Sequence, residues 1–144
     1  MTVKQLSVFA ENRPGRLSAI TGFIAEEGIN IRAISVADTK DFGIMRIIVD
    51  DTEKALKVLR ANNCSVTQTN VIAVTADDTP GGMASIMETL YKDNISVEYM
   101  YSAFINPSKN VACLIVRVDN NDAAVQALGE AGFKLVSEQE LLEF

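Results

Sequence analysis

Histidine is absent from this 144-residue sequence. Its absence removes the commonest general base and the commonest side-chain ligand of transition metals. The sequence also lacks the G-x-S-x-G, H-E-x-x-H, P-loop and C-x-x-C patterns, which mark several classes of active site. We therefore expect a protein without catalytic activity, cofactor or catalytic metal, although an enzyme built on Asp, Lys or Tyr stays open.

Cysteine and positive charge are scarce as well. Cys64 and Cys113 are the only cysteines, and we interpret them as reduced thiols that act as small core residues of a cytoplasmic protein. The formal net charge is -6, and no run of Lys and Arg offers the basic face that nucleic acid or an anionic membrane requires. No apolar run approaches the roughly 18 residues of a membrane span, and the N-terminal residues lack the pattern of a signal peptide. We expect neither nucleic acid nor a membrane as a partner.

One loop occurs twice in the sequence. ENRPGRL at Glu11–Leu17 and DDTPGGM at Asp77–Met83 each place a Pro-Gly pair between an alternating apolar run and an apolar pattern of helical spacing. The second pair lies 66 positions after the first, and such a fixed offset indicates an internal repeat. Two cores of roughly 70 residues would each be marginal alone. We therefore predict repeats at 1–69 and 70–144 that pack on each other.

The first half of the chain has the order βαββαβ. We expect Asp50 and Glu53 to cap its second helix, because they have capping-box spacing, and we expect Asp38–Gly43 to turn the chain between two strands. Apolar periodicity and turn residues predict a strand at Val3–Phe9, a helix from Leu17 that stops at Gly28, strands at Asn30–Ala37 and Ile44–Asp50, a helix that ends at Asn62-Asn63, and a strand at Cys64–Thr69.

The second half repeats this order. Three residues are added in the hairpin around Ile105–Asn110. The final Ser137–Phe144 begins with Ser-x-x-Glu and predicts a short terminal helix, with a strand tail as the alternative. The remaining expected elements are strands at Val71–Ala76, Ile95–Phe104, Val111–Asp119 and Phe133–Ser137, a helix at Met83–Tyr91, and a helix along Ala124, Val125 and Leu128 that stops at Gly132.

A βαββαβ unit predicts the split-βαβ, ferredoxin-like arrangement, an α+β fold in which an antiparallel four-stranded sheet carries both helices on one face. The strand at Ile44–Asp50 is apolar on both faces, because Ile44 and Ile48 alternate with Met45, Ile47 and Val49. The face without helices therefore needs a cover. A second repeat or a second chain would supply it, and we predict a homodimer.

Two motif pairs resemble those of a known family. N-R-P-G-R-L at 12–17 is followed by G-I-N-I at 28–31, and D-T-P-G-G-M at 78–83 is followed at the same spacing by N-I-S-V at 94–97. In a βαββαβ context these pairs resemble the ACT domain, a small amino-acid-sensing module, and the whole chain resembles a stand-alone tandem of two ACT repeats. The resemblance implies a non-catalytic regulatory protein. It also implies that a small ligand, usually an amino acid, binds between repeats and that its occupancy is passed to a regulated enzyme partner.

The resemblance places the ligand at the loop after the first strand and at the start of the second strand of a repeat. Pro14 fixes φ and Gly15 has no Cβ, so backbone N–H groups can approach a ligand closely. The helix that begins there favours an anion such as an α-carboxylate, and the Asn30 amide can orient the ammonium or carboxylate of the ligand. The candidate ligand-binding residues are Asn12, Arg13, Pro14, Gly15, Arg16, Leu17, Asn30 and Ile31 in the first repeat, and Asp78, Thr79, Pro80, Gly81, Gly82, Met83, Ser96 and Val97 in the second.

Each feature also has a plainer interpretation. The Pro-Gly loops can be tight turns only, Asn30 a turn residue, and Arg13 and Arg16 solvated surface charges. Ser96 departs from the asparagine expected at its position, which puts the second site in doubt or gives it different chemistry. The group Tyr99, Met100, Tyr101 and Phe104 fits core packing or the lining of a site for an apolar side chain. A structural interaction protein without a small ligand is the alternative function.

Overall fold

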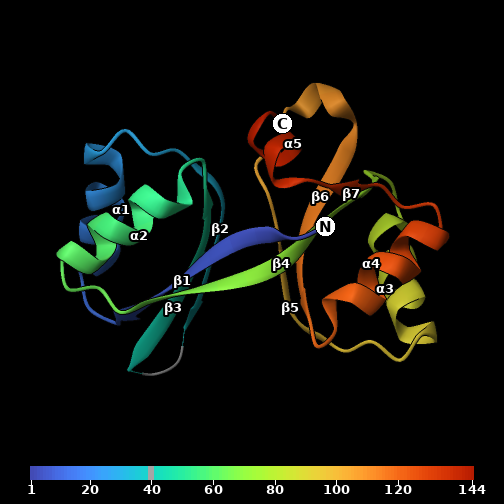
Figure 1. Cartoon of the computed structure of the whole chain (residues 1–144), viewed down its shortest axis with the longest axis horizontal. Helices are drawn as coiled ribbons and strands as arrows, with labels where there is room; N and C mark the ends of the chain where they lie inside the picture. Colours follow the sequence, from blue (N-terminus) through green and yellow to red (C-terminus); the bar gives the residue numbers. More distant parts are fainter. Residues whose placement is uncertain (39–40) are drawn as a thin grey trace. The chain divides into compact units, whose positions relative to one another are not determined.

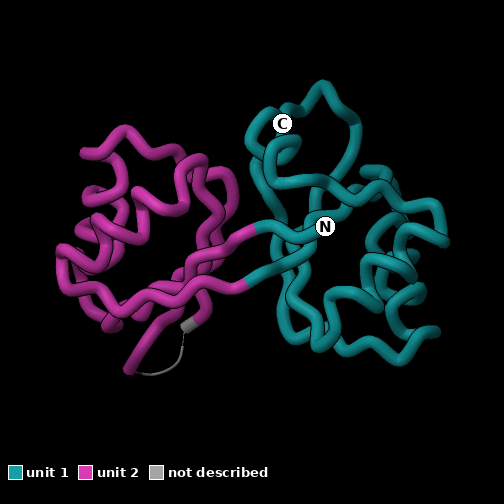
Figure 2. The backbone as a smooth tube through the Cα atoms, in the orientation of Figure 1, with its two compact units in different colours: residues 1–3, 70–144 teal, residues 4–69 magenta. Residues whose placement is uncertain are grey.

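The structure, a computed structural model, describes residues 1–38 and 41–144. They form two compact units (Figure 2): an N-terminal unit, Lys4–Thr69, and a C-terminal unit, Asn70–Phe144 with Met1–Val3. The boundary lies within one strand, β4 (Val66–Asp77). The prediction of separate strands at Cys64–Thr69 and Val71–Ala76 was therefore wrong, since the strand continues through Asn70, the one turn-favouring residue between them. The predicted repeat limits, 1–69 and 70–144, stay a prediction.

The N-terminal unit confirms the expected element order. Its strands lie in the order β2-β3-β1-β4, and both helices cover one face of this sheet (Figure 1). The elements are β1 (Val3–Glu11), α1 (Arg16–Glu26), β2 (Ile31–Asp38), β3 (Phe42–Val49), α2 (Thr52–Ala61) and the first part of β4. Residues 39 and 40 of the turn predicted at Asp38–Gly43 lie outside the described residues.

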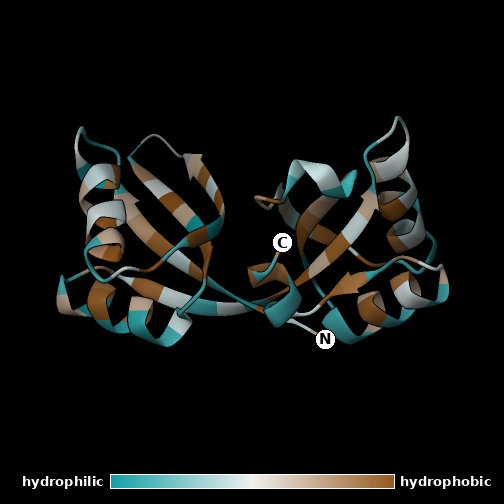
Figure 3. Cartoon of the chain, turned by 90° about the horizontal axis from the view of Figure 1, so that it is seen from above, coloured by the Kyte–Doolittle hydropathy of each residue, from teal (hydrophilic) through white to brown (hydrophobic). Residues whose placement is uncertain are grey.

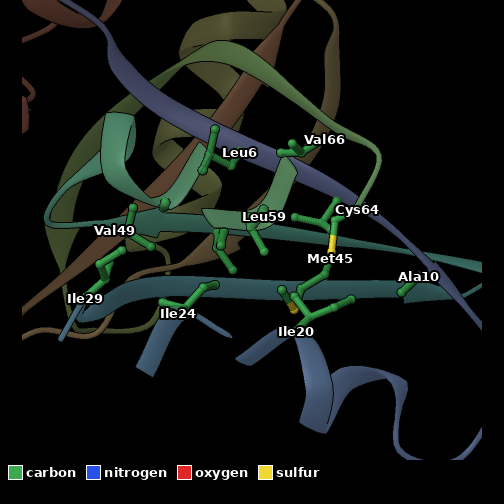
Figure 4. Close-up of a cluster of buried hydrophobic side chains, with 13 residues drawn as sticks. Leu6, Ala10, Ile20, Ile24, Ile29, Met45, Val49, Leu59, Cys64 and Val66 are labelled. Atoms are coloured by element: carbon green, nitrogen blue, oxygen red, sulfur yellow. The ribbon is translucent and has the colours of Figure 1, made fainter. Parts of the chain in front are cut away.

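A cluster of buried side chains joins helices and sheet in this unit (Figure 4). Alternate residues of β1 and β3 enter the cluster because successive side chains of a strand point to opposite faces. Ile20 and Ile24 of α1 meet them at the helical spacing of four. Ile48 of β3 lies outside this cluster and is nevertheless fully buried, so both faces of β3 contain buried apolar side chains.

The C-terminal unit has the same topology, with its strands in the order β7-β4-β6-β5. Two helices cover one face, and a short terminal helix lies on the other face (Figures 1 and 3). The elements after β4 are α3 (Gly82–Lys92), β5 (Val97–Ser102), the 3-10 turn η1 (Pro107–Lys109), β6 (Val111–Val118), α4 (Asn121–Glu130), β7 (Leu135–Val136) and α5 (Glu138–Leu142). The last strand is thus shorter than the predicted Phe133–Ser137, because helix α5 begins directly after it.

The terminal helix α5 forms as the Ser-x-x-Glu signal predicts, and the alternative strand tail does not occur. The backbone N–H of Glu140 donates to Oγ of Ser137 over 3.1 Å. The Glu140 carboxylate lies 3.8 Å from Nζ of Lys134, and Leu141 is fully buried. The C-terminal residues are therefore an ordered part of this unit.

The predicted cap of the second helix was wrong by one residue. Asp51, not Asp50, precedes α2, and its carboxylate accepts a hydrogen bond from the backbone N–H of Lys54 over 3.1 Å. Asp50 accepts instead from the backbone N–H of Asn30 over 2.9 Å. Only Asp50 has a glutamate three residues on, whereas Lys54 stands three residues after Asp51, so the capping-box spacing favoured the wrong aspartate.

Candidate functional site

The first Pro-Gly loop joins β1 to α1. Gly15 has φ +85°, a left-handed conformation that glycine adopts without steric cost, and no side chain caps the helix. The first backbone bond of the helix runs from the N–H of Ala19 to the carbonyl of Gly15 over 2.9 Å. The N–H groups of Leu17 and Ser18 donate to no acceptor in the described part of the chain. The loop therefore presents two free donors at the positive end of a helix dipole.

The second loop repeats this backbone arrangement. Gly81 has φ +89°, and again no side chain caps the helix that follows. The backbone N–H of Ser85 donates to the carbonyl of Gly81 over 3.0 Å, while the N–H groups of Met83 and Ala84 have no acceptor among the described residues. Both candidate loops thus offer the same pair of free donors.

The side chains of the two loops differ. Nε of Arg13 lies 3.2 Å from the Glu11 carboxylate at an exposed position. Arg16 bends back onto its own unit, where Nη2 lies 3.8 Å from Sγ of Cys64. Its Nε is buried and donates to no acceptor among the described residues. Arg13 is thus an exposed surface charge, whereas Arg16 is partly buried, and the counterparts in the second repeat, Thr79 and Gly82, are uncharged.

Asn30 and Ser96, the candidate residues at the second strands, occupy matching positions. The backbone N–H of Asn30 donates to Asp50, and the carbonyl of Asn30 accepts from the Asp50 N–H over 3.1 Å. Ser96 and Asp119 exchange the same two bonds, each 3.2 Å long. Asp50 and Asp119 therefore fix the backbone at these two positions, and the exposed side chain of Asn30 stays available to a ligand.

Within one unit, the loop and the second-strand residue lie far apart. Glu11 pairs with Phe42 at the start of β3, whereas Ile31 pairs with Val49 at its end. Helix α1, 11 residues long, also separates them, and 11 residues of helix rise about 16 Å. The structure therefore does not bring Asn12–Leu17 and Asn30 of the same repeat together around one amino acid.

A cavity of about 160 Å³ opens beside the first loop. Ala10 and Gly43 from two adjacent strands, Leu17 of α1 and Val36 of β2 form its apolar part, and Glu11, Asn12 and Arg13 complete the lining. Sequence reasoning found Asn12, Arg13 and Leu17 but missed the other four. The pairing of Ala10 with Gly43 across the sheet is the missing information, and the small size of both residues was the only signal for it.

Two wider cavities adjoin other candidate residues. One of about 520 Å³ runs along α1 and includes Asn30 and Ile31. The other, of about 320 Å³, is lined by Thr79, Pro80, Gly81 and Gly82 together with residues that include Phe133. The candidate residues of the first repeat are thus distributed over two separate cavities.

The aromatic strand and the cysteines have mainly structural surroundings. Met100 packs against the core cluster of the C-terminal unit, Tyr99 and Tyr101 are half-buried, and Phe104 is exposed. Both cysteines are buried free thiols. Burial raises the pKa of the Cys113 thiol from 9.0 to about 11, so this cysteine is a neutral thiol near pH 7 and not a nucleophilic thiolate.

Two ferredoxin-like units, each with a left-handed glycine at the start of its first helix, define a tandem of one small α+β module. The chain belongs to the ACT domain pair family, which it matches over residues 1–144.

Solved structures share this architecture. A protein of Bacteroides thetaiotaomicron is 38% identical and superimposes with a TM-score of 0.92, over 100% of this chain and 98% of that chain. The regulatory subunit of aspartate kinase from Thermus thermophilus, in its ligand-free form, is 18% identical with a TM-score of 0.64, over 90% of this chain and 92% of that chain. The similarity to the aspartate kinase regulatory subunit shows a shared fold only.

Among curated proteins, the acetolactate synthase small subunit of Buchnera aphidicola subsp. Baizongia pistaciae is 41% identical over 44 residues. This match covers 31% of the present chain and 28% of that subunit.

Within residues 1–38 and 41–144, no helix is both long and apolar enough to cross a membrane. The same residues contain no group of three or more Cys, Asp and Glu side chains placed to hold a metal ion.

Proposed function

We propose that this chain is a non-catalytic regulatory protein that binds an amino acid at an interface between ACT repeats. The observation that carries the proposal is the pair of free N–H groups, Leu17 and Ser18, behind the left-handed Gly15. Two donors at a helix start suit a carboxylate, and every α-amino acid carries one. Such a site binds without a general base or a nucleophile, in keeping with a sequence that contains no histidine.

The relatives support a role beside an enzyme. One is named as the small subunit of acetolactate synthase, and another as the regulatory subunit of aspartate kinase. We infer that ligand occupancy here is likewise passed to an enzyme partner. Transmission requires that the ligand bind two states of an interface with different affinity. The buried free thiols Cys64 and Cys113 fit the reducing cytoplasm.

Because the loop and Asn30 lie far apart within one repeat, the ligand would be bound by residues from two repeats. In this proposal the loop Asn12–Leu17 of one repeat takes the carboxylate, and Asn30 of a neighbouring repeat contacts the same ligand. Because one repeat holds these groups at opposite ends of α1, the site is complete only where repeats pair. A homodimer provides such pairs.

A melting screen against the twenty L-amino acids tests the proposal. A ligand at 100 times its dissociation constant adds about 2.7 kcal/mol to the free energy of unfolding. For a chain of this length that raises the melting temperature by roughly 5 to 10 °C. If no amino acid shifts the wild type, the sensor function is wrong, and a structural interaction protein becomes the better description.

Two variants then localise the site by calorimetric titration. Asn30→Ala should weaken binding by about 1 to 3 kcal/mol, the cost of a lost buried polar contact. Gly15→Val should abolish binding, since its Cβ would enter open space at the loop where the carboxylate lies. Gly132→Val is the matched control, because Gly132 also has positive φ and open space around it but ends α4. Normal binding by both Asn30→Ala and Gly15→Val would move the site to Asp78–Met83.

A further inference from the structure

The cavity of about 160 Å³ in the N-terminal unit lies between the first turn of α1 and the ends of three strands. Ala10, Val36 and Gly43 lie on the sheet face that carries the helices, because each stands two positions along its strand from a residue of the core layer: Val8, Ile34 and Met45 respectively. The cavity is therefore the open end of the layer between helix and sheet. Ala10 and Gly43 are too small to fill this end.

The mouth of the cavity carries charges of both signs. Glu11 and Arg13 line it and form an exposed ion pair of 3.2 Å. Leu17, whose backbone N–H has no acceptor among residues 1–38 and 41–144, belongs to the same lining. The α-ammonium and α-carboxylate groups of an amino acid match this arrangement. Glu11 attracts the ammonium group, while Arg13 and the free N–H groups attract the carboxylate.

We propose that this cavity receives the side chain of an aliphatic L-amino acid, while Glu11 and Arg13 bind its ammonium and carboxylate groups. The inference rests on the proposed function and specifies its ligand. An apolar cavity of about 150 Å³ can hold a molecule of the size of benzene, so 160 Å³ suffices for the three or four carbons of valine, leucine or isoleucine. A charged side chain would exchange water for the apolar surfaces of Ala10, Val36 and Gly43, and is therefore disfavoured.

Gly43 sets the depth of the cavity. A Cβ built at Gly43 would stand 3.5 Å from the carbonyl oxygen of Ala37 and 4.0 Å from Cγ1 of Val36. These are ordinary contacts, so alanine fits the strand without strain while its methyl group occupies cavity space. The second repeat already has this residue, since Ala112 is the counterpart of Gly43, 69 positions on. Its counterparts of Arg13 and Val36 are Thr79 and Ser102, so the second repeat has lost both the cation and the apolar wall.

Calorimetric titration of the full chain with free L-alanine, L-valine, L-leucine, L-aspartate and L-lysine tests the inference. The wild type should bind valine or leucine at least tenfold more tightly than it binds alanine, aspartate or lysine. Gly43→Ala should weaken leucine binding about tenfold or more and change alanine binding less than twofold, since it removes the space of one methyl group. Ala112→Gly is the matched control in the second repeat and should change neither affinity.

The outcomes separate the inference from the function on which it rests. If none of the twenty amino acids binds, both are wrong. If amino acids bind but aspartate or lysine is preferred, or if Gly43→Ala leaves the leucine-to-alanine ratio unchanged, the regulatory function stands and this cavity is not the side-chain pocket. A change of that ratio in Ala112→Gly and not in Gly43→Ala would assign the pocket to the second repeat.

Discussion

Replacing Gly82 with alanine should destabilise the C-terminal unit, whereas the same substitution at Gly129 should stabilise it slightly. Gly82 is the first residue of α3. A Cβ built there would stand 2.3 Å from the carbonyl oxygen of Asp77. Carbon and oxygen atoms without a covalent bond approach to about 3.3 Å, so a backbone atom at the end of β4 would have to move by about 1 Å.

The magnitude follows from the contacts that this movement disturbs. Overpacking against a fixed group costs about 1 to 3 kcal/mol. Displacing the helix start also weakens the bond from the Gly82 N–H to the carbonyl of Thr79, 3.1 Å long, and a hydrogen bond contributes about 1 kcal/mol. The expected loss is therefore about 2 to 4 kcal/mol. At Gly129 in α4 a Cβ meets nothing within 4 Å, and alanine in place of glycine in a helix gains up to about 1 kcal/mol.

Thermal unfolding followed by circular dichroism measures both effects under identical conditions. The melting temperatures of Gly82→Ala and Gly129→Ala should differ by roughly 5 to 20 °C. A Gly82→Ala protein that melts within about 1 °C of the wild type would show that α3 can shift freely at the end of β4. The packing of that loop described above would then be incorrect.

Two further predictions concern pH and assembly. Burial raises the pKa of Cys113 from 9.0 in the unfolded chain to about 11, so the native thiol keeps its proton to higher pH. The resulting stabilisation, on the order of 2 to 3 kcal/mol, is complete below pH 9 and is lost as the pH rises towards 11. Denaturant titrations should show that this alkaline loss is smaller in Cys113→Ala than in the wild type. We also expect sedimentation equilibrium at high micromolar concentration to give a dimer of the 15.6 kDa chain, and a monomer there would contradict the pairing of repeats between chains.

The fold could be predicted from the sequence because its determinants are local and occur twice. Gly15 and Gly81 begin the first helices, and in each repeat the apolar residues of those helices follow at spacings of three and four. Ser137 signals α5 through a side-chain bond to its own helix. Each of these signals depends on residues within one turn or one helix, and each can therefore be detected in the sequence alone.

The features that the sequence did not reveal depend on pairing across the sheet. The exchange of hydrogen bonds between Asn30 and Asp50 joins residues 20 positions apart, and without it Asp50 is indistinguishable from a helix cap. The cavity beside Leu17 exists because Ala10 lies opposite Gly43 in the register of β1 and β3. Register cannot be read from the alternation of one strand, since a shift of two residues preserves the pattern of faces.

The comparison of the two repeats separates backbone function from side-chain function. The left-handed glycine, the two free N–H groups and the aspartate bonds to the second strand occur in both repeats, so they are requirements of the shared module. Arg13, Asn30 and Gly43 have no such constancy, because the second repeat has Thr79, Ser96 and Ala112 in their places. The shared fold therefore does not require these three side chains. In the proposed site, Arg13 and Asn30 would contact the head group of the ligand and Gly43 its side chain. Under the proposed function, the two loops therefore bind different ligands, or only the first loop binds one. A titration of the wild type with its preferred aliphatic amino acid should then reach saturation at one ligand per chain. Two equivalent sites per chain would show that Arg13, Asn30 and Gly43 do not determine ligand selectivity.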